Sequence, residues 1–432
     1  MSERTSHNND FEQGNVPAGS RRGFWPMLVV MLGFTFFSAS MFAGGRLGAG
    51  MTFKGFLLSV LAGNLILGAY TGVLAFMAAR TGSSIHILSR YAFGQKGSYL
   101  PSAILAFTQV GWFGVGVAMF AIPVQAYLKE QGFAWAQGNG CLWAIVLAAG
   151  ACMTFTAYFG IKSLTILSFV AVPLIIVFGC LSSGRALLSE GGAGLTKLLN
   201  FTPDAESAIS ATTAIAISIG SFISGGTCTP DFVRFSKNSR VAVMTTVIAF
   251  FLGNTLMFFF GAAGAMVYNK ADIADVLVIQ GLLLPAILSL GLNIWTTNDN
   301  AIYTSGLGVS NITGLPKRLT VLVNGTIGTL AAVWLYNNFV SYLNFLNTII
   351  PPVGAVLIAD FFVCHCGQYQ PIEKTVFRRV NWCAVVAWMA GSAVAFVPVG
   401  VAAINGMICA AFVYIFLSMA VVFFKDHQEA AR

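Results

Sequence analysis

Charged side chains are scarce in this chain. Only 9% of its 432 residues are Asp, Glu, Lys or Arg, while 57% are hydrophobic. A soluble globular domain carries about 25% charged residues, so this composition cannot cover a water-facing surface. The apolar runs are about 20 residues long and do not alternate with period two, which indicates membrane-spanning helices rather than a β-barrel. The sequence therefore predicts an all-α integral membrane protein.

Clustered histidine and cysteine are also lacking. No spacing of the eight cysteines resembles a disulfide framework. Cys364 and Cys366 flank a histidine, but no second half of a four-ligand metal site follows them. No HExxH motif, acid cluster or nucleophile–base pair lies in any apolar run. These absences argue against a membrane enzyme and against a resident metal or cofactor.

Twelve apolar runs predict twelve transmembrane helices. They lie at residues 27–45, 55–79, 99–124, 141–160, 163–184, 206–226, 241–268, 277–301, 319–337, 341–363, 380–398 and 401–424. The first 24 residues are polar and contain acids, which indicates a solvated tail rather than a cleaved signal peptide. Arginine and lysine gather before the first run and after each even-numbered run, on the side that is cytoplasmic by the positive-inside rule. Both termini are therefore expected inside a bacterial inner membrane. The net charge of +8 reflects this topology and not a nucleic-acid-binding surface.

Two of the runs contain clustered glycine and hydroxyl residues in their middle. The first contains LGFTFFSASMFAGGRLGAG (32–50) and the sixth contains IGSFISGGTCTPDF (219–232). Paired interrupted helices at equivalent positions of two repeats mark the binding site of a transporter. The alternative is that the glycines only permit close helix packing, which Gly44 and Gly48 fit well. The coincidence of two such runs favours the transporter hypothesis.

The distance of five spans between the two interruptions also predicts how the chain is divided. An odd number of spans per repeat means that the two copies insert with opposite orientations. We expect a cytoplasmic tail at 1–24, a first inverted repeat at 25–188 and a second inverted repeat at 206–364. Two further helices are expected within 380–424.

The eighth run carries an unusual density of polar residues, NIWTTNDN at 293–300. On a helix, Asn293, Thr296 and Thr297 share one arc roughly 100° wide. Their oxygens suit a monovalent cation that is held without a carboxylate. Backbone freed by the first interruption, near Gly33 and Phe36, would supply carbonyl ligands. Hydrogen bonding between helices uses the same residue types, and the sequence leaves both interpretations open.

Titratable groups that would move a proton are scarce in mid-membrane. A proton-coupled pump normally needs such a group within the membrane. The candidate acids Asp231, Asp299 and Asp360 each lie toward the cytoplasmic end of a span. The histidines fall in tails or loops: His7, His86, His365 and His427. We therefore favour sodium over protons as the coupling ion, with proton coupling as the alternative.

The third run offers groups that suit a planar, neutral ligand. Gln109 and Trp112 are three residues apart and so lie on one face of a helix. Trp provides a flat stacking surface, while Gln provides a donor and an acceptor. Phe222 and Ser224 flank the second interruption and offer a second ring and a second polar group. An interfacial position for Trp112 and a helix–helix hydrogen bond for Gln109 are the alternatives.

Six stretches of the chain together carry a resemblance to a known family. They are QVGWFGVGVAMFAIP (109–123), GSFISGGT (220–227), DFVRF (231–235), GLNIWTTNDNA (291–301), WLYNNFV (334–340) and IPPVG (350–354). The chain resembles the bacterial cytosine permeases of the nucleobase–cation symporter-1 family, from about residue 24 to 424. The resemblance implies twelve transmembrane helices, as a LeuT-like five-plus-five inverted repeat followed by two C-terminal helices. It also implies cation-driven uptake of a nucleobase.

Carried over residue by residue, the resemblance implies both a base site and an ion site. The implied substrate-binding residues are Gln109, Trp112, Phe222, Ser224, Gly33 and Asn293, with the base between the two rings. The implied sodium ligands are Gly33, Phe36, Asn293, Thr296 and Thr297. These residues predict a sodium-coupled cytosine importer that works by alternating access, with Na⁺ as co-transported ion and membrane lipid around it. We expect a monomer. Uracil, hydantoin, allantoin or a purine as substrate, and a channel instead of a carrier, stay open as alternatives.

Overall fold

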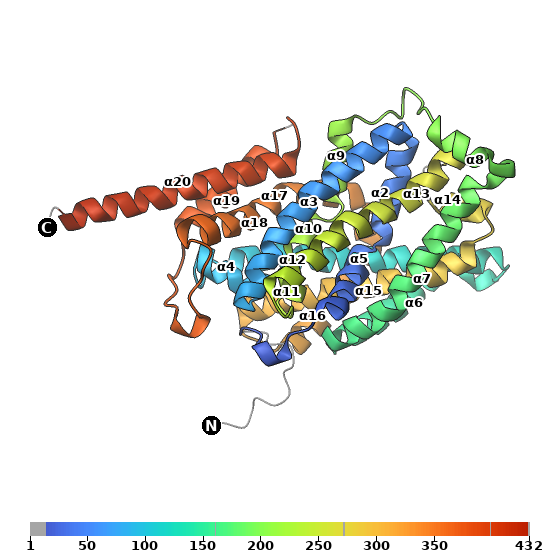
Figure 1. Ribbon diagram of the computed structural model, residues 1–432. Coiled ribbons are helices and arrows are strands. Elements are labelled where there is room, and N and C mark those ends of the chain that lie inside the picture. Colours follow the sequence, from blue (N-terminus) through green and yellow to red (C-terminus); the bar gives the residue numbers. More distant parts are fainter. Residues whose placement is uncertain (1–13, 160, 271–272, 398, 431–432) are drawn as a thin grey trace.

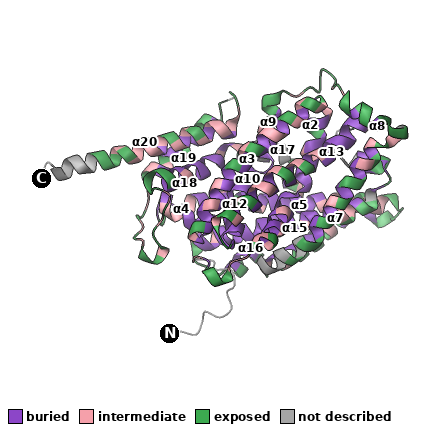
Figure 2. Cartoon of the chain, viewed as in Figure 1, coloured by how far each residue is buried: buried purple, intermediate pink, exposed green. Residues whose placement is uncertain are grey.

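The computed structural model describes residues 14–159, 161–270, 273–397 and 399–430 of the chain. The regular elements within these residues are all helices, which confirms the all-α prediction. Most of them lie side by side in one bundle, and the C-terminal part of the last helix extends away from it (Figure 1). Buried residues fill the centre of this bundle, and exposed ones lie at its periphery (Figure 2).

The helices follow the predicted runs closely. The first part of the chain contains η1 (Ala18–Ser20), α1 (Phe24–Thr35), α2 (Ser38–Ala49), α3 (Phe53–Thr81), α4 (Ile85–Phe93), α5 (Tyr99–Glu130), η2 (Ala134–Gln137), α6 (Asn139–Tyr158), α7 (Ile161–Leu187) and α8 (Ser189–Leu199). The second part contains α9 (Ala211–Gly220), α10 (Ile223–Thr227), α11 (Pro230–Val233), α12 (Ser239–Ile248), η3 (Ala249–Asn254), α13 (Thr255–Tyr268), α14 (Ile273–Ile279), α15 (Leu283–Thr313), α16 (Lys317–Asn337), α17 (Phe339–Ile349), α18 (Pro351–Ala359), η4 (Asp360–Cys364), η5 (Ile372–Lys374), α19 (Trp382–Ala395) and α20 (Ala402–Ala430).

Long apolar helices account for most of the predicted spans. Among the described residues, 8 helices are long and apolar enough to cross a membrane, and two bent helix pairs raise this number to 10. The helices α15 and α19 occupy the positions of the eighth and eleventh predicted spans. The protein is thus an all-helical integral membrane protein, consistent with twelve spans.

Both predicted interruptions are present. Helices α1 and α2 meet at an angle of 53°, and α9 meets the segment Ile223–Val233 at 50°. In the first span the chain is extended at Phe37, with φ −125° and ψ 130°. In the second span the break falls at Phe222, with φ −136° and ψ 3°. The prediction of two broken helices is confirmed, and both breaks fall at phenylalanine rather than at glycine.

The glycines of the first span serve close packing instead. A Cβ atom added to Gly48 would lie 2.8 Å from the Cα atom of Ala262 on α13. A Cβ atom on Gly44 would overlap the backbone carbonyl of Phe258 on the same helix. For these two glycines the packing alternative is therefore the correct one.

The eighth predicted span, 277–301, had wrong boundaries. The chain turns at Gly281, which has φ +64° and thus a conformation that favours glycine. This turn separates α14 from α15, and α15 then continues to Thr313. The polar segment 293–300 consequently lies in the middle of a 31-residue helix rather than at the end of a span.

Two segments expected in solvent pack against the bundle. Residues 1–13 of the predicted tail lie outside the described residues, but Val16 is 1% exposed and its N–H donates to Gly82 O at 2.8 Å. The loop after the second span folds into the short helix α4, where His86 is 1% exposed. Apolar residues at Ile85, Leu88 and Phe93 bury one face of this helix. The prediction that His86 lies in a loop was therefore wrong.

Candidate functional site

The end of α1 brings free backbone carbonyls against the middle of α15. The N–H of Phe36 makes the last helical hydrogen bond, to Leu32 O at 2.8 Å, so carbonyls of the final turn lose their helical partners. Thr296 Oγ1 donates to the carbonyl of Gly33 at 3.2 Å. Asn293 Nδ2 donates to the carbonyl of Phe36. The interrupted span and the polar segment of α15 thus meet as the sequence predicts.

A third carbonyl, that of Asn293, lies in the same cluster. It accepts hydrogen bonds from Thr296 Oγ1 at 2.8 Å and from Thr297 Oγ1 at 3.1 Å. Both threonines are buried, and Ser38 Oγ, a residue that sequence reasoning missed, donates to Asn293 Oδ1 at 3.0 Å. All five predicted ion ligands therefore lie in one cluster of neutral oxygens. Such oxygens suit a hard monovalent cation, and they also form the interhelical hydrogen bonds of the alternative hypothesis.

The polar residues predicted for the base also lie together. Gln109 on α5 donates from Nε2 to Ser224 Oγ on α10 at 3.0 Å. Ser224 Oγ in turn donates to Thr108 Oγ1 at 3.2 Å. Gln109 is 2% exposed and Ser224 is fully buried. This pair links the third span to the second interruption.

The two predicted stacking rings both contact a third ring. Phe37 makes edge-to-face contacts with Trp112, at 5.4 Å between centroids, and with Phe222, at 6.2 Å. Trp112 also packs edge-to-face on Tyr342, at 6.0 Å. Sequence reasoning missed Phe37 and Tyr342. The only signal for Phe37 is its place beside Phe36 in the first interruption.

A small central cavity joins the two sets of residues. Its lining includes Gln109, Trp112 and Phe222 from the predicted base site, Thr297 from the predicted ion site, and Phe37. The cavity has a volume of about 20 Å³, close to the roughly 10–15 Å³ that one water molecule needs. The cavity is therefore too small for a nucleobase in this conformation. Phe37, Trp112 and Phe222 all line this cavity.

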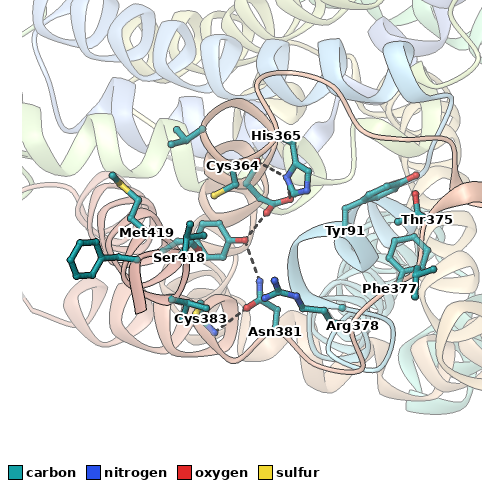
Figure 3. Close-up of a pocket in the computed structure, with 18 residues that line it drawn as sticks. Tyr91, Cys364, His365, Thr375, Phe377, Arg378, Asn381, Cys383, Ser418 and Met419 are labelled. Carbon is teal, nitrogen blue, oxygen red and sulfur yellow. Dashed lines mark hydrogen bonds and ion pairs between the residues drawn. The ribbon is translucent and has the colours of Figure 1, made fainter. Parts of the chain in front are cut away.

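A larger cavity, of about 630 Å³, lies elsewhere and contains none of the predicted site residues. His365, Asn381 and Arg378 stand around it (Figure 3). Its buried carboxylate, Asp360, accepts hydrogen bonds from Tyr369 OH at 2.5 Å and from Tyr414 OH at 2.6 Å. A hydrogen bond with Asp360 also raises the pKa of the His365 side chain. This cavity is built around an ionisable network, unlike the neutral central cavity.

The other two candidate acids have structural partners. Asp231 Oδ1 accepts the backbone N–H of Ile85, the first residue of α4, at 2.9 Å. Asp299 Oδ1 accepts from Thr156 Oγ1 at 2.7 Å. Neither acid lines the central cavity. Within the described part of the chain, no aspartate or glutamate therefore lines this cavity.

Comparison with known proteins identifies the family. A family model described as "Permease for cytosine/purines, uracil, thiamine, allantoin" matches residues 15–419. The chain belongs to this family. It is 49% identical over 413 residues to the cytosine permease of Escherichia coli strain K12, covering 96% of this chain and 95% of that protein. It is also 22% identical over 371 residues to the hydantoin permease of Microbacterium maritypicum, covering 78% and 74% of the two chains.

Solved structures with the same fold are transporters. The nucleobase-cation-symport-1 family transporter MHP1, in a closed conformation with bromovinylhydantoin bound, matches with a TM-score of 0.80 at 19% identity and covers 96% of both chains. A Na⁺-coupled sialic acid symporter matches with a TM-score of 0.69 at 12% identity, covering 96% of this chain and 92% of that one. The family resemblance drawn from the sequence is confirmed, and with it the LeuT-like fold class. The protein is a membrane permease and not an enzyme.

Proposed function

We propose that this permease imports cytosine together with a sodium ion across the bacterial inner membrane. The observation that carries the proposal is the meeting of four elements at one small cavity. The first interruption offers carbonyls, α15 offers hydroxyls, α5 offers Gln109 and Trp112, and the second interruption offers Phe222 and Ser224. Thr297, a proposed ion ligand, lines the same cavity as Gln109, Trp112 and Phe222, so the proposed ion and base sites adjoin, as coupling of the two requires.

Cytosine is the substrate that the chain's chemistry and its relatives favour. Its flat ring would stack between Trp112 and Phe222 once Phe37 moves aside. Its amide-like edge would exchange hydrogen bonds with Gln109 and Ser224, which now bond to each other. Gly33 and Asn293 would complete this edge from the neighbouring helices. The 49% identity to a protein named cytosine permease supports this choice over other planar amides.

Sodium is the proposed coupling ion. The carbonyls of Gly33, Phe36 and Asn293, with the hydroxyls of Thr296 and Thr297, would hold it without a fixed negative charge. The Na⁺-coupled sialic acid symporter with the same fold supports this proposal. One sodium ion that moves inward gains about 2.3 kcal/mol per 100 mV. That energy concentrates a neutral base by a factor of roughly fifty, at tenfold per 1.4 kcal/mol.

The transport cycle is proposed to be alternating access by two inverted repeats, at residues 25–188 and 206–364. Base and ion bind together, and the two repeats rock around them. We further propose a monomer with both termini in the cytoplasm, since basic residues gather on that side.

Uptake of radiolabelled base into proteoliposomes tests the proposal. With an inward sodium gradient, we expect cytosine to accumulate against its own gradient and uptake to saturate. Potassium in place of sodium should abolish accumulation. Uptake that ignores sodium but follows a pH gradient would contradict the sodium site. Excess unlabelled hydantoin, uracil and purine serve as competitors, and stronger competition by hydantoin than by cytosine would favour the substrate class of the Microbacterium relative.

A further inference from the structure

The polar face of α15 continues beyond the predicted ion ligands. Asn293, Thr297, Asn300 and Thr304 follow one another at spacings of four, three and four residues. At 3.6 residues per turn these side chains lie within roughly 60° of arc on one face of the helix. Asn300 and Thr304 therefore continue the polar face two helical turns beyond the ion site, toward the end of α15 that is predicted to be cytoplasmic.

Asn300 has no structural reason to be polar. It is 1% exposed, and neither its Nδ2 nor its Oδ1 atom has a hydrogen-bond partner in the part of the chain that the structure describes. The hydroxyl of Thr304 is also buried, and it lies near the carboxyl group of Asp231. Buried polar groups without partners cost free energy, so the unpaired amide on this face of α15 needs an explanation, and contact with a passing ion is one.

The polar face of α15 ends near the carboxylate of Asp231. His86 Nε2 lies 3.2 Å from the carbonyl of Thr304 and 3.7 Å from Asp231 Oδ2. The second distance is too long for a hydrogen bond, and Asp231 Oδ2 is buried with no hydrogen-bond partner among the described residues. Burial lowers the pKa of His86 to about 3, so the imidazole is neutral beside this carboxylate.

The charge beside Asp231 is that of Arg234. Its Nε donates to the backbone carbonyl of Asp231 at 3.2 Å, and its Nη2 donates to Tyr303 OH at 3.2 Å. A nearby guanidinium weakens cation binding at Asp231. A group on an exit path must bind an ion weakly enough to release it. The surroundings of Asp231 thus favour brief binding of a cation over tight binding.

We propose that Asn300, Thr304 and Asp231 form a transient sodium station between the ion site and the cytoplasm. An amide oxygen, a hydroxyl and a carboxylate would replace waters of the ion in turn as it leaves Thr297. The inference rests on the proposed function, because it assumes that sodium occupies the site at Asn293, Thr296 and Thr297. It adds residues that do not touch the base and act only on ion release.

The substitution Asn300→Leu tests the station without removing any hydrogen bond. Leucine keeps the branched shape of asparagine, and the amide that it replaces makes no hydrogen bond within the described residues. The melting temperature should therefore fall less than in the control variant below, which makes the same change in size. Equilibrium binding of cytosine and sodium to purified protein should be unchanged. The maximal rate of sodium-driven uptake should fall about tenfold, which is the rate equivalent of losing one polar contact to an ion. Efflux of ²²Na⁺ from loaded proteoliposomes should slow equally.

A matched control is Asn324→Leu. Asn324 is also buried, but its Nδ2 donates to Ser305 Oγ at 3.1 Å. This variant should lose melting temperature and keep its uptake rate per folded molecule, the reverse of Asn300→Leu. Thr304→Val is the second test variant if Asn300→Leu does not fold.

The outcomes distinguish failure of the sodium station from failure of the proposed function. A wild-type uptake rate in both Asn300→Leu and Thr304→Val would overturn the station. A raised sodium requirement in equilibrium binding would also overturn it, because Asn300 would then belong to the ion site itself. Uptake by the wild type that needs no sodium would overturn the proposed function, and the station with it.

Discussion

The two interrupted spans break in similar places but for different physical reasons. In the first, the backbone is extended at Phe37, and the carbonyls of Gly33 and Phe36 are met by side chains of α15. In the second, the break at Phe222 is followed by two glycines. A Cβ on Gly225 would lie 2.8 Å from the Phe222 ring and 2.9 Å from the Phe34 ring.

This difference suggests that the two interruptions have different roles in coupled transport. The first interruption exposes backbone oxygen, which suits an ion. The second places the Phe222 ring against Gly225, and an aromatic ring suits a flat base. Glycine leaves space for a ring only in the second case, whereas Gly44 and Gly48 of the first span permit close contact with α13. In the first case the neighbouring helix stabilises the opened backbone.

The largest expected effect tests the second interruption. Phe222→Ala removes one face of the proposed stack and should weaken cytosine binding by about 1–3 kcal/mol, the range for loss of base–aromatic stacking. Its sodium requirement should change little. Titration of cytosine binding by calorimetry checks this, with Phe107→Ala as control, since Phe107 on α5 is 62% exposed. An unaltered cytosine affinity would remove Phe222 from the site.

A smaller effect tests the first interruption. Thr297→Ala removes one hydroxyl and should raise the sodium concentration for half-maximal uptake, by the equivalent of about 0.5–1.5 kcal/mol for one hydrogen-bonding contact. Cytosine affinity at saturating sodium should hold. The control is Thr326→Ala, an exposed threonine on α16. If sodium dependence does not move, the cluster on α15 serves helix packing alone.

The smallest expected effect is a pH dependence of stability that comes from His365 in the larger cavity and not from the two interruptions. Because Asp360 raises the pKa of His365, the protonated histidine stabilises the folded state at low pH. That contribution is fully present below the unfolded pKa of about 6.5 and is lost as pH rises through the folded value. His365 is 43% exposed, so the change is modest.

Melting temperatures between pH 5 and pH 8, about the range in which histidine titrates, measure this effect. They should fall with rising pH in the wild type and fall less in His365→Gln. Sodium-driven uptake should show no matching pH dependence, because the central cavity has no titratable group. An equal pH response of the two proteins would show that His365 does not contribute.

Much of this arrangement follows from the sequence, and what does not follow depends on packing. Hydropathy locates the spans, and the i, i+3, i+4 spacing places Asn293, Thr296 and Thr297 together. Hydropathy also merged α14 with the start of α15, because the turn at Gly281 lies within an apolar run. The first interruption indicated the backbone near Gly33 and Phe36, and the Phe36 carbonyl accepts a hydrogen bond from Asn293 on α15.

The sequence gives no means of telling which aromatic ring of a pair faces a cavity. Phe36 and Phe37 are adjacent and chemically identical, and only the extended backbone between α1 and α2 directs the Phe37 ring toward Trp112. The burial of His86 is hidden in the same way. The apolar residues Ile85, Leu88 and Phe93 indicate a packed segment, but they do not reveal that α4 docks against Asp231.

The tightness of the central cavity has a consequence for measured affinity. A conformation with space for about one water, at about 20 Å³, must give way to a wider one before a base can bind. The observed dissociation constant then equals the intrinsic constant divided by the fraction of molecules already in the wider form. Substitutions that shrink Phe37 would raise that fraction, and they would tighten apparent binding without adding a single contact to the base.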